Sequence, residues 1–175
     1  MRDGGGDPLF NRIVNKTFGY EGGYNPGDTG GETMHGISQK AHPGLNIKGV
    51  TKDMARDIYK KEYYDAIGAS NLPPALRMAA FDTAVIAGPG RARQFLKQSG
   101  GDPMKFLELR EKYMHGLVQS NPAKYGRYEK GWNNRNADLR KTVAGMMRED
   151  PNMPQTQVAA SDRASAKPTT RAVPY

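Results

Sequence analysis

The sequence predicts a mainly α-helical domain over residues 8–148, with a small β-hairpin lobe, and an extended tail over residues 149–175. Three observations support this fold class. Apolar residues recur at helical spacing in several segments, a Gly-rich stretch interrupts them once, and the C-terminal segment is rich in Pro, Ala, Ser and Thr without periodicity. Such a composition cannot bury a core, so we expect the tail to be extended and held by a partner. The rest of the chain is long enough for one packed domain.

The first predicted helix covers residues 9–20. Its apolar residues, from Phe10 to Phe18, follow the i, i+3, i+4, i+7 spacing of an amphipathic helix. One further turn brings Glu21 onto or beside the buried face, and the two glycines that follow supply the backbone freedom that ends a helix. We therefore expect Glu21 at the C-terminus of this helix, partly buried.

The remaining elements follow from turn residues, caps and apolar spacing. Residues 24–49 are rich in Gly, Pro, Asn and Asp, with a β-like stretch at MHGIS, and predict an irregular hairpin. Thr51 is a candidate N-cap for a helix through residue 67, and Pro73 precedes an unusually apolar and therefore central helix. Further helices are expected at residues 91–99, 103–119 and 131–147, the last with Trp132 in the core.

Composition and charge argue against several kinds of site and partner. The absence of cysteine excludes disulfides and thiolate chemistry, and the three histidines lack metal-ligand spacing, so we expect no metal and no other cofactor. No apolar run is long enough to span a membrane, and the N-terminus lacks the apolar region of a secretory signal. The net charge of +8 indicates an anionic partner. Nucleic acid is not expected, because basic and aromatic residues are not interleaved.

The segment around Glu21 has the residues that glycoside hydrolysis requires. That reaction needs a carboxylic acid that protonates the leaving oxygen, and a second polar group that manages water or the developing positive charge. Burial beside apolar side chains and the negative end of a helix both favour the protonated form of a carboxyl group. Asp28 is the candidate second carboxylate, although an aspartate in a Pro-Gly-Asp turn also serves as a turn cap. Thr33 is the candidate for holding the attacking water.

Three further residues are candidate contacts to the substrate. Tyr24 lies next to the acid and can stack on a sugar ring. Glu32 is either a surface charge or an alternative second carboxylate. Asp82 lies inside an apolar helix and needs a hydrogen-bonding partner if it is buried, so an anchoring role competes with a role in the site.

The stretch EGGYNPGDTGGETMHGIS at residues 21–38 resembles the signature of glycoside hydrolase family 108, the phage and bacterial N-acetylmuramidases. Three later stretches, KEYYDAI, FDTAVIAGPGRA and GWNNR, resemble further motifs of that family in the same order, so the likeness spans roughly residues 10–147. The sequence departs from the family at Ile86, where the family has an asparagine, and at residues 98–106, where a family motif is replaced.

The resemblance implies a lysozyme-like fold with the hairpin lobe beside an active-site cleft. It implies cleavage of the β-1,4 bond between N-acetylmuramic acid and N-acetylglucosamine in peptidoglycan glycan strands. Glu21 matches the catalytic glutamate of the family, and Asp28 and Thr33 match its loop aspartate and threonine. If these two residues position a water, the reaction inverts the sugar and the carboxyl groups lie about 6.5–9.5 Å apart, whereas a nucleophilic partner lies at about 5–5.5 Å.

Two alternatives remain open at this point. A lytic transglycosylase would use the same glutamate on the same bond, and the sugar's own hydroxyl would replace water. A non-catalytic structural virion protein would retain only the fold. For the setting, we expect a phage virion protein that acts on the bacterial wall or periplasm and binds other virion tail proteins through its C-terminal tail. The alternative is an endolysin held in the host cytoplasm until a holin releases it.

Overall fold

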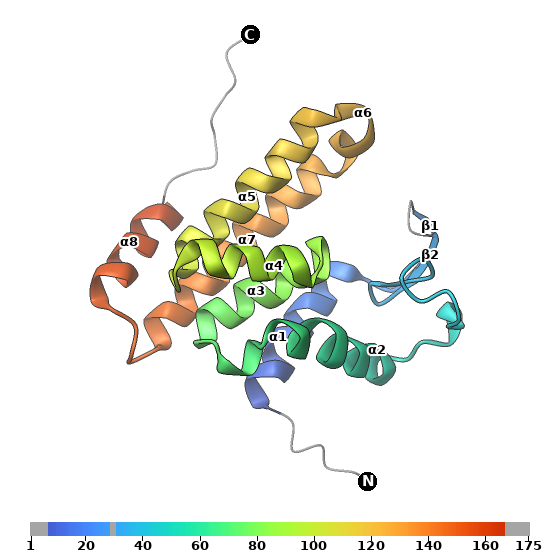
Figure 1. Ribbon diagram of the computed structural model, residues 1–175, viewed down its shortest axis with the longest axis horizontal. Coiled ribbons are helices and arrows are strands. Elements are labelled where there is room, and N and C mark those ends of the chain that lie inside the picture. Colours follow the sequence, from blue (N-terminus) through green and yellow to red (C-terminus); the bar gives the residue numbers. More distant parts are fainter. Residues whose placement is uncertain (1–6, 29–30, 167–175) are drawn as a thin grey trace. The chain divides into compact units, whose positions relative to one another are not determined.

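The computed structural model describes residues 7–28 and 31–166 of the chain (Figure 1). The backbone divides into two compact units, one ending at Ser70 and one beginning at Asn71. Within the described ranges, no helix is long and apolar enough to cross a membrane. The expected class, mainly α-helical with a small β lobe, is confirmed.

The first unit begins with helix α1, Pro8–Glu21, close to its predicted bounds. Asp7 caps it by accepting a 3.0 Å hydrogen bond from the backbone N–H of Leu9. The helix ends because Gly22 adopts a φ of 71°, which a residue with a side chain rarely tolerates. Glu21 is therefore the last helical residue, and it is half-buried as expected.

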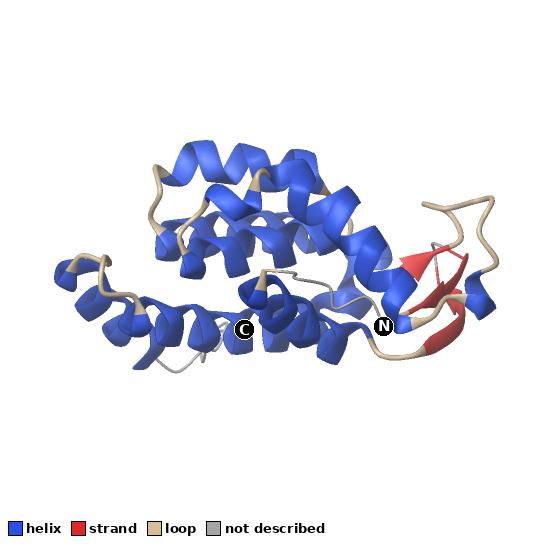
Figure 2. Ribbon diagram, turned by 90° about the horizontal axis from the view of Figure 1, so that it is seen from below, coloured by secondary structure: helices blue, strands red, loops and turns tan. Residues whose placement is uncertain are grey.

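The Gly-rich segment forms a three-stranded antiparallel sheet in the order β1-β2-β3 (Figure 2). The central strand β2 places Thr33 opposite Asn25 on one side and Ser38 on the other. The strands are short, and the pairing of β1 with β2 is irregular after Asn25. Their bounds are Tyr24–Asp28 for β1, Gly31–Met34 for β2 and Ile37–Ser38 for β3.

Helix α2, Lys52–Tyr59, starts at the predicted cap, because the Thr51 hydroxyl accepts the N–H of Met54 at 3.2 Å. We expected one continuous helix through residue 67, but a π-helical turn, Lys60–Tyr64, and a 3₁₀ turn, Asp65–Ile67, follow α2. The wider π turn has a physical reason. Tyr59 and Tyr64 are both fully buried, and five residues of α-helix would point them about 140° apart.

The second unit is built around α3, which contacts α4, α5 and α7, so the central place expected for this apolar helix is correct. Nine residues of α3 are buried. A short helix α6 and a 3₁₀ turn connect α5 to α7. The bounds are Pro74–Ala87 for α3, Pro89–Ser99 for α4, Pro103–Ser120 for α5, Pro122–Tyr125 for α6, Glu129–Glu149 for α7 and Gln155–Ala166 for α8.

Two expectations about the C-terminal part differ from the structure. Trp132 is not in the core: it is half-buried in the first turns of α7 and stacks on Tyr128 with ring centres 5.6 Å apart. The tail is not extended up to Ala166, because residues 155–166 form α8. This helix packs on α7, buries Ser161 fully and pairs Asp162 with Arg148, and its alanines favour helix. Residues 167–175 lie outside the described part of the chain.

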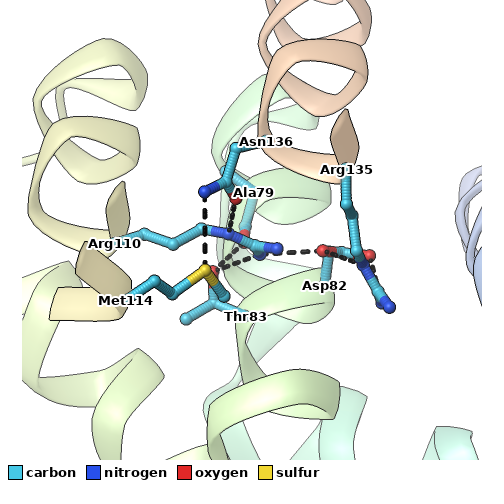
Figure 3. A network of polar contacts seen from close by, with 7 residues as sticks. All are labelled: Ala79, Asp82, Thr83, Arg110, Met114, Arg135 and Asn136. Atoms are coloured by element: carbon cyan, nitrogen blue, oxygen red, sulfur yellow. Dashed lines mark hydrogen bonds and ion pairs between the residues drawn. The ribbon is translucent and has the colours of Figure 1, made fainter. Parts of the chain in front are cut away.

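A buried ionic network joins three helices of the second unit (Figure 3). Asp82 of α3 is fully buried between Arg110 of α5, at 2.7 Å, and Arg135 of α7, at 2.9 Å. Arg110 also donates to Thr83 at 3.0 Å and to Asn136 at 2.8 Å. Burial by itself raises the pKa of Asp82, but the two guanidinium groups lower it further, so the carboxylate stays ionised.

We predict that Arg110→Ala lowers the free energy of unfolding by about 3–5 kcal/mol, because it leaves a buried carboxylate with one cation fewer. Arg140→Ala is the matched control: its pair with Glu111 is partly exposed, and its loss lowers stability by about 1 kcal/mol or less. Urea unfolding followed by the fluorescence of the single tryptophan reports on this unit. Equal losses in both variants would contradict the prediction.

Candidate functional site

The side chain of Glu21 lies directly against the backbone of Gly36, in the turn between β2 and β3. A Cβ atom added to Gly36 would stand 2.8 Å from Cγ of Glu21 and 3.0 Å from its Oε2. The same atom would stand 2.2 Å from the hydroxyl oxygen of Tyr59. Only a residue without a side chain fits this place, so the end of α1, the end of α2 and the β2–β3 turn meet at Gly36.

The hydroxyl of Tyr59 holds the β2–β3 turn in place. Tyr59 is fully buried and donates a 2.8 Å hydrogen bond to the backbone carbonyl of His35. His35 has a φ of 52° and Gly36 a φ of 80°, so two consecutive residues adopt the left-handed conformation. Non-glycine residues in this conformation are uncommon and often occur at functional sites. The Phe18 ring packs against both Tyr59 and His35 and links the turn to α1.

Tyr63, in the π-helical turn, lies within electrostatic reach of Glu21. Burial raises the pKa of Tyr63, and the charges of Glu62 and Glu21 raise it further. Its ring also packs edge-on against Tyr59 at 5.5 Å. The surroundings of Glu21 therefore include two tyrosines, from α2 and from the turn that follows it.

The sheet carries three of the residues predicted for the site. Thr33 is half-buried in β2, and within the described residues its hydroxyl makes no hydrogen bond. Its neighbour Glu32 points to the opposite face, because successive side chains alternate along a strand. A ligand on one face of the sheet can therefore meet Thr33 or Glu32, not both. Asp28 ends β1 opposite Gly31, and its side chain lies outside the described part of the structure.

Tyr24 and Glu32 form a pair on the outer part of the sheet. The Tyr24 hydroxyl donates a 2.8 Å hydrogen bond to Glu32, which raises the pKa of Tyr24. Lys48 lies 3.6 Å from the same carboxylate and 5.7 Å from the centre of the Tyr24 ring. Tyr24 is 41% exposed, one of the two large exposed hydrophobic side chains of the described chain. It is therefore available to a ligand, while Glu32 already has two partners.

Asp82 does not join this group. It belongs to the second unit and is fully buried between two arginines, so it has the anchoring surroundings that were the alternative to a role in the site. Among the described residues, no group of three histidine or acidic side chains could hold a metal ion.

Sequence reasoning missed Gly36, Tyr59 and His35, and it favoured a core role for Tyr63 over a role in sugar stacking. A signal for the first was present, since a glycine inside the β-like stretch MHGIS indicates a bulge or a close backbone approach. No comparable signal marked Tyr59 or Tyr63, because tyrosines at helical spacing are usually core residues.

A pocket of about 650 Å³ opens beside the end of α1, next to Glu21 along the chain. Its walls come from α1, from the loop after it, from the β2–β3 turn and from α2. The lining residues are Asn15, Phe18, Gly19, Gly22, Gly23, His35, Lys52 and Arg56.

Comparisons with known proteins indicate a family and a fold. The family model described as glycosyl hydrolase 108 matches residues 14–88, a range that contains Glu21, the whole sheet and Tyr59. The solved structure of SagA from Brucella abortus superposes with a TM-score of 0.69 at 24% identity, over 79% of this chain and 95% of SagA. At that identity the likeness shows the fold alone. A search of curated proteins finds no match.

We predict that Gly36→Ala lowers thermal stability clearly, by about 2 kcal/mol or more, because alanine is strained at positive φ and its methyl group meets the Tyr59 hydroxyl. Gly44→Ala is the matched control, since nothing lies within 4 Å of an added Cβ there. Adding Tyr59→Phe to Gly36→Ala removes the closest clash. If Gly36→Ala and Gly44→Ala unfold at the same temperature, the close approach at residue 36 is wrong.

Proposed function

We propose that this chain, which belongs to glycosyl hydrolase family 108 through its residues 14–88, cleaves peptidoglycan glycan strands with Glu21 as general acid. The family match supports a glycoside hydrolase, and the fold is lysozyme-like. The bond is the β-1,4 linkage between N-acetylmuramic acid and N-acetylglucosamine. The observation that carries the proposal is the position of Glu21 at the end of α1, fitted against Gly36 and half-exposed.

The packing of Glu21 supports the role of proton donor. Catalytic groups need a fixed direction, because a misplaced donor loses much of the rate enhancement. Helix α1 fixes the backbone of Glu21, and the contact with residue 36 limits where its carboxyl group can go. Tyr59 in turn fixes residue 36 through its bond to the His35 carbonyl. Because Glu21 is not fully enclosed, a glycosidic oxygen can reach it.

Thr33 supports a reaction in which water attacks the sugar while Glu21 protonates the leaving oxygen. A threonine hydroxyl can donate and accept a hydrogen bond at the same time, which suits it to orient a water. The hydroxyl of Thr33 has no competing partner within the described residues. With Asp28 as the base, the reaction would be a single displacement that inverts the sugar. A lytic transglycosylase does not need a water-holding group, so a Thr33 hydroxyl without a hydrogen bond to any described residue favours the hydrolase.

The biological setting is part of the proposal. A net charge of +8 suits an enzyme that works on an anionic cell envelope, and the attraction weakens with added salt. We place the protein in a phage, either as a virion component for wall penetration or as an endolysin for release. This setting rests on the sequence resemblance to phage muramidases.

We predict that Glu21→Gln lowers the rate of peptidoglycan cleavage by about 1,000-fold or more, because the amide cannot donate a proton to the leaving oxygen. Glu108→Gln, an exposed glutamate of α5, is the control and keeps wild-type activity. Purified peptidoglycan is digested with each variant, and the new chain ends are identified by mass spectrometry. Reducing muramic acid ends support the muramidase. Anhydro-muramic ends indicate the transglycosylase, and no cleavage by folded wild-type protein refutes the enzyme.

We predict that Thr33→Ala lowers kcat by about 10-fold to 100-fold, whereas Glu32→Gln changes kcat by less than about threefold. The difference follows from their opposite faces on β2 and from the partners that Glu32 already has. Thr33→Ser should retain most activity, since it keeps the hydroxyl. The reverse order, a larger loss in Glu32→Gln, would make Glu32 the second carboxylate.

A further inference from the structure

We propose that the pocket beside α1 binds a carboxylate of the peptide stem that muramic acid carries in peptidoglycan. This inference rests on the proposed function, since it concerns the same substrate. It adds a preference for glycan that carries peptides, because Lys52 and Arg56 of α2 would bind the peptide carboxylate. We call the eight-residue pocket defined above the cation pocket.

The charges of the cation pocket are not balanced by the protein. Lys52 and Arg56 both line it, and within the described residues neither forms an ion pair with a carboxylate. Asp53 and Asp57 each point about 100° away from the cation that precedes them, and Asp53, three residues before Arg56 and about 60° from it, forms no ion pair with it. The pocket therefore presents a positive surface.

This arrangement of cations is unfavourable for α2 by itself. Lys52 and Arg56 stand four residues apart, where like charges repel. Lys52 is also the first residue of the helix, where the helix dipole disfavours a positive charge. A bound anion relieves both effects. Two local penalties at one pocket thus point to an anionic ligand.

Contacts within the protein hold the Arg56 guanidinium in one orientation. Its Nη1 donates to Asn11 at 3.2 Å and its Nη2 donates to Asn15 at 3.1 Å. Its guanidinium carbon also lies 5.6 Å from the centre of the Phe18 ring. The partners are neutral, so they orient the guanidinium and leave its charge available. A pre-oriented charge binds more tightly, because less freedom is lost on binding.

The position of the pocket selects the stem peptide among possible anions. Gly22 and Gly23, which directly follow Glu21, form part of its wall. The lining residue His35 precedes Gly36, against which Glu21 packs, so a peptide of a few residues that is attached to a sugar bound at Glu21 can reach the pocket. Stem peptides are attached to muramic acid, and they carry free carboxylates. A volume of about 650 Å³ falls within the range of small-ligand sites, about 300–1,000 Å³.

The experiment measures binding rather than cleavage, using Glu21→Gln so that the ligand stays intact. Calorimetry compares three probes: a disaccharide–tetrapeptide with free carboxylates, the same molecule with its carboxylates amidated, and the peptide-free disaccharide. We expect the free-carboxylate probe to bind at least about tenfold more tightly than the amidated one, as for a charge-assisted hydrogen bond.

Two variants in the Glu21→Gln background then test the pocket, one on α2 and one on α1. Arg56→Gln removes the charge. Gly19→Leu fills the space, since nothing lies within 4 Å of an added Cβ and a leucine favours the helix. Both are expected to abolish the preference for free carboxylates. The controls Lys124→Gln and Gly116→Leu, an exposed cation and an open helical glycine of the second unit, are expected to keep it.

Equal affinity for the free and amidated probes overturns the inference, as does a preference that survives in Gly19→Leu. Inorganic phosphate that binds as tightly as the muropeptide overturns the assignment to a peptide. The proposed function is judged separately by wild-type cleavage of peptidoglycan. Cleavage without a carboxylate preference rejects only the pocket, and a carboxylate preference without cleavage rejects only the hydrolase.

Discussion

The site depends on one close approach, at Gly36. The carboxyl-bearing side chain of Glu21 and the hydroxyl of Tyr59 both lie where a side chain of residue 36 would otherwise be. Neither α1 nor α2 could come this near to the sheet if residue 36 carried a Cβ atom. The same turn needs positive φ at two successive residues, and the Tyr59 bond to the His35 carbonyl holds that conformation. The direction of Glu21 is thus set by a backbone position ten or more residues further along the chain.

The close approach at Gly36 depends on two other features of the first unit, the end of α1 and the π turn after α2. Helix α1 delivers Glu21 at its last residue, because Gly22 ends the helix there. The π turn after α2 brings Tyr64 onto the buried side together with Tyr59, which anchors the helix that supplies the hydroxyl. Glu21 then has the pre-oriented, half-exposed position that a general acid needs. In the second unit, the ion pairs of the buried Asp82 carboxylate with two arginines join three helices.

The sequence was informative where local rules decide the structure. The spacing of α1 and the glycines after it placed Glu21 correctly, and Thr51 and the prolines marked the starts of α2 and α3. Tertiary contacts decided the rest. The close approach at Gly36 joins residues far apart in the chain, and the π turn depends on burying two tyrosines at once. The helix at residues 155–166 was missed because its composition is that of a loop, and packing against α7 supplies what its weak apolar pattern lacks.

The match to the glycosyl hydrolase 108 model covers Glu21, and the contact with Gly36 gives that side chain a fixed direction. The most direct test is a crystal structure of the Glu21→Gln variant with a bound peptidoglycan tetrasaccharide. We expect the side-chain nitrogen of the substituted residue 21 within about 3.2 Å of the glycosidic oxygen between muramic acid and glucosamine. The Tyr59 bond to the His35 carbonyl should remain in place. A glycan whose glycosidic oxygen lies next to a different carboxyl group, with residue 21 out of reach, would contradict the role of Glu21.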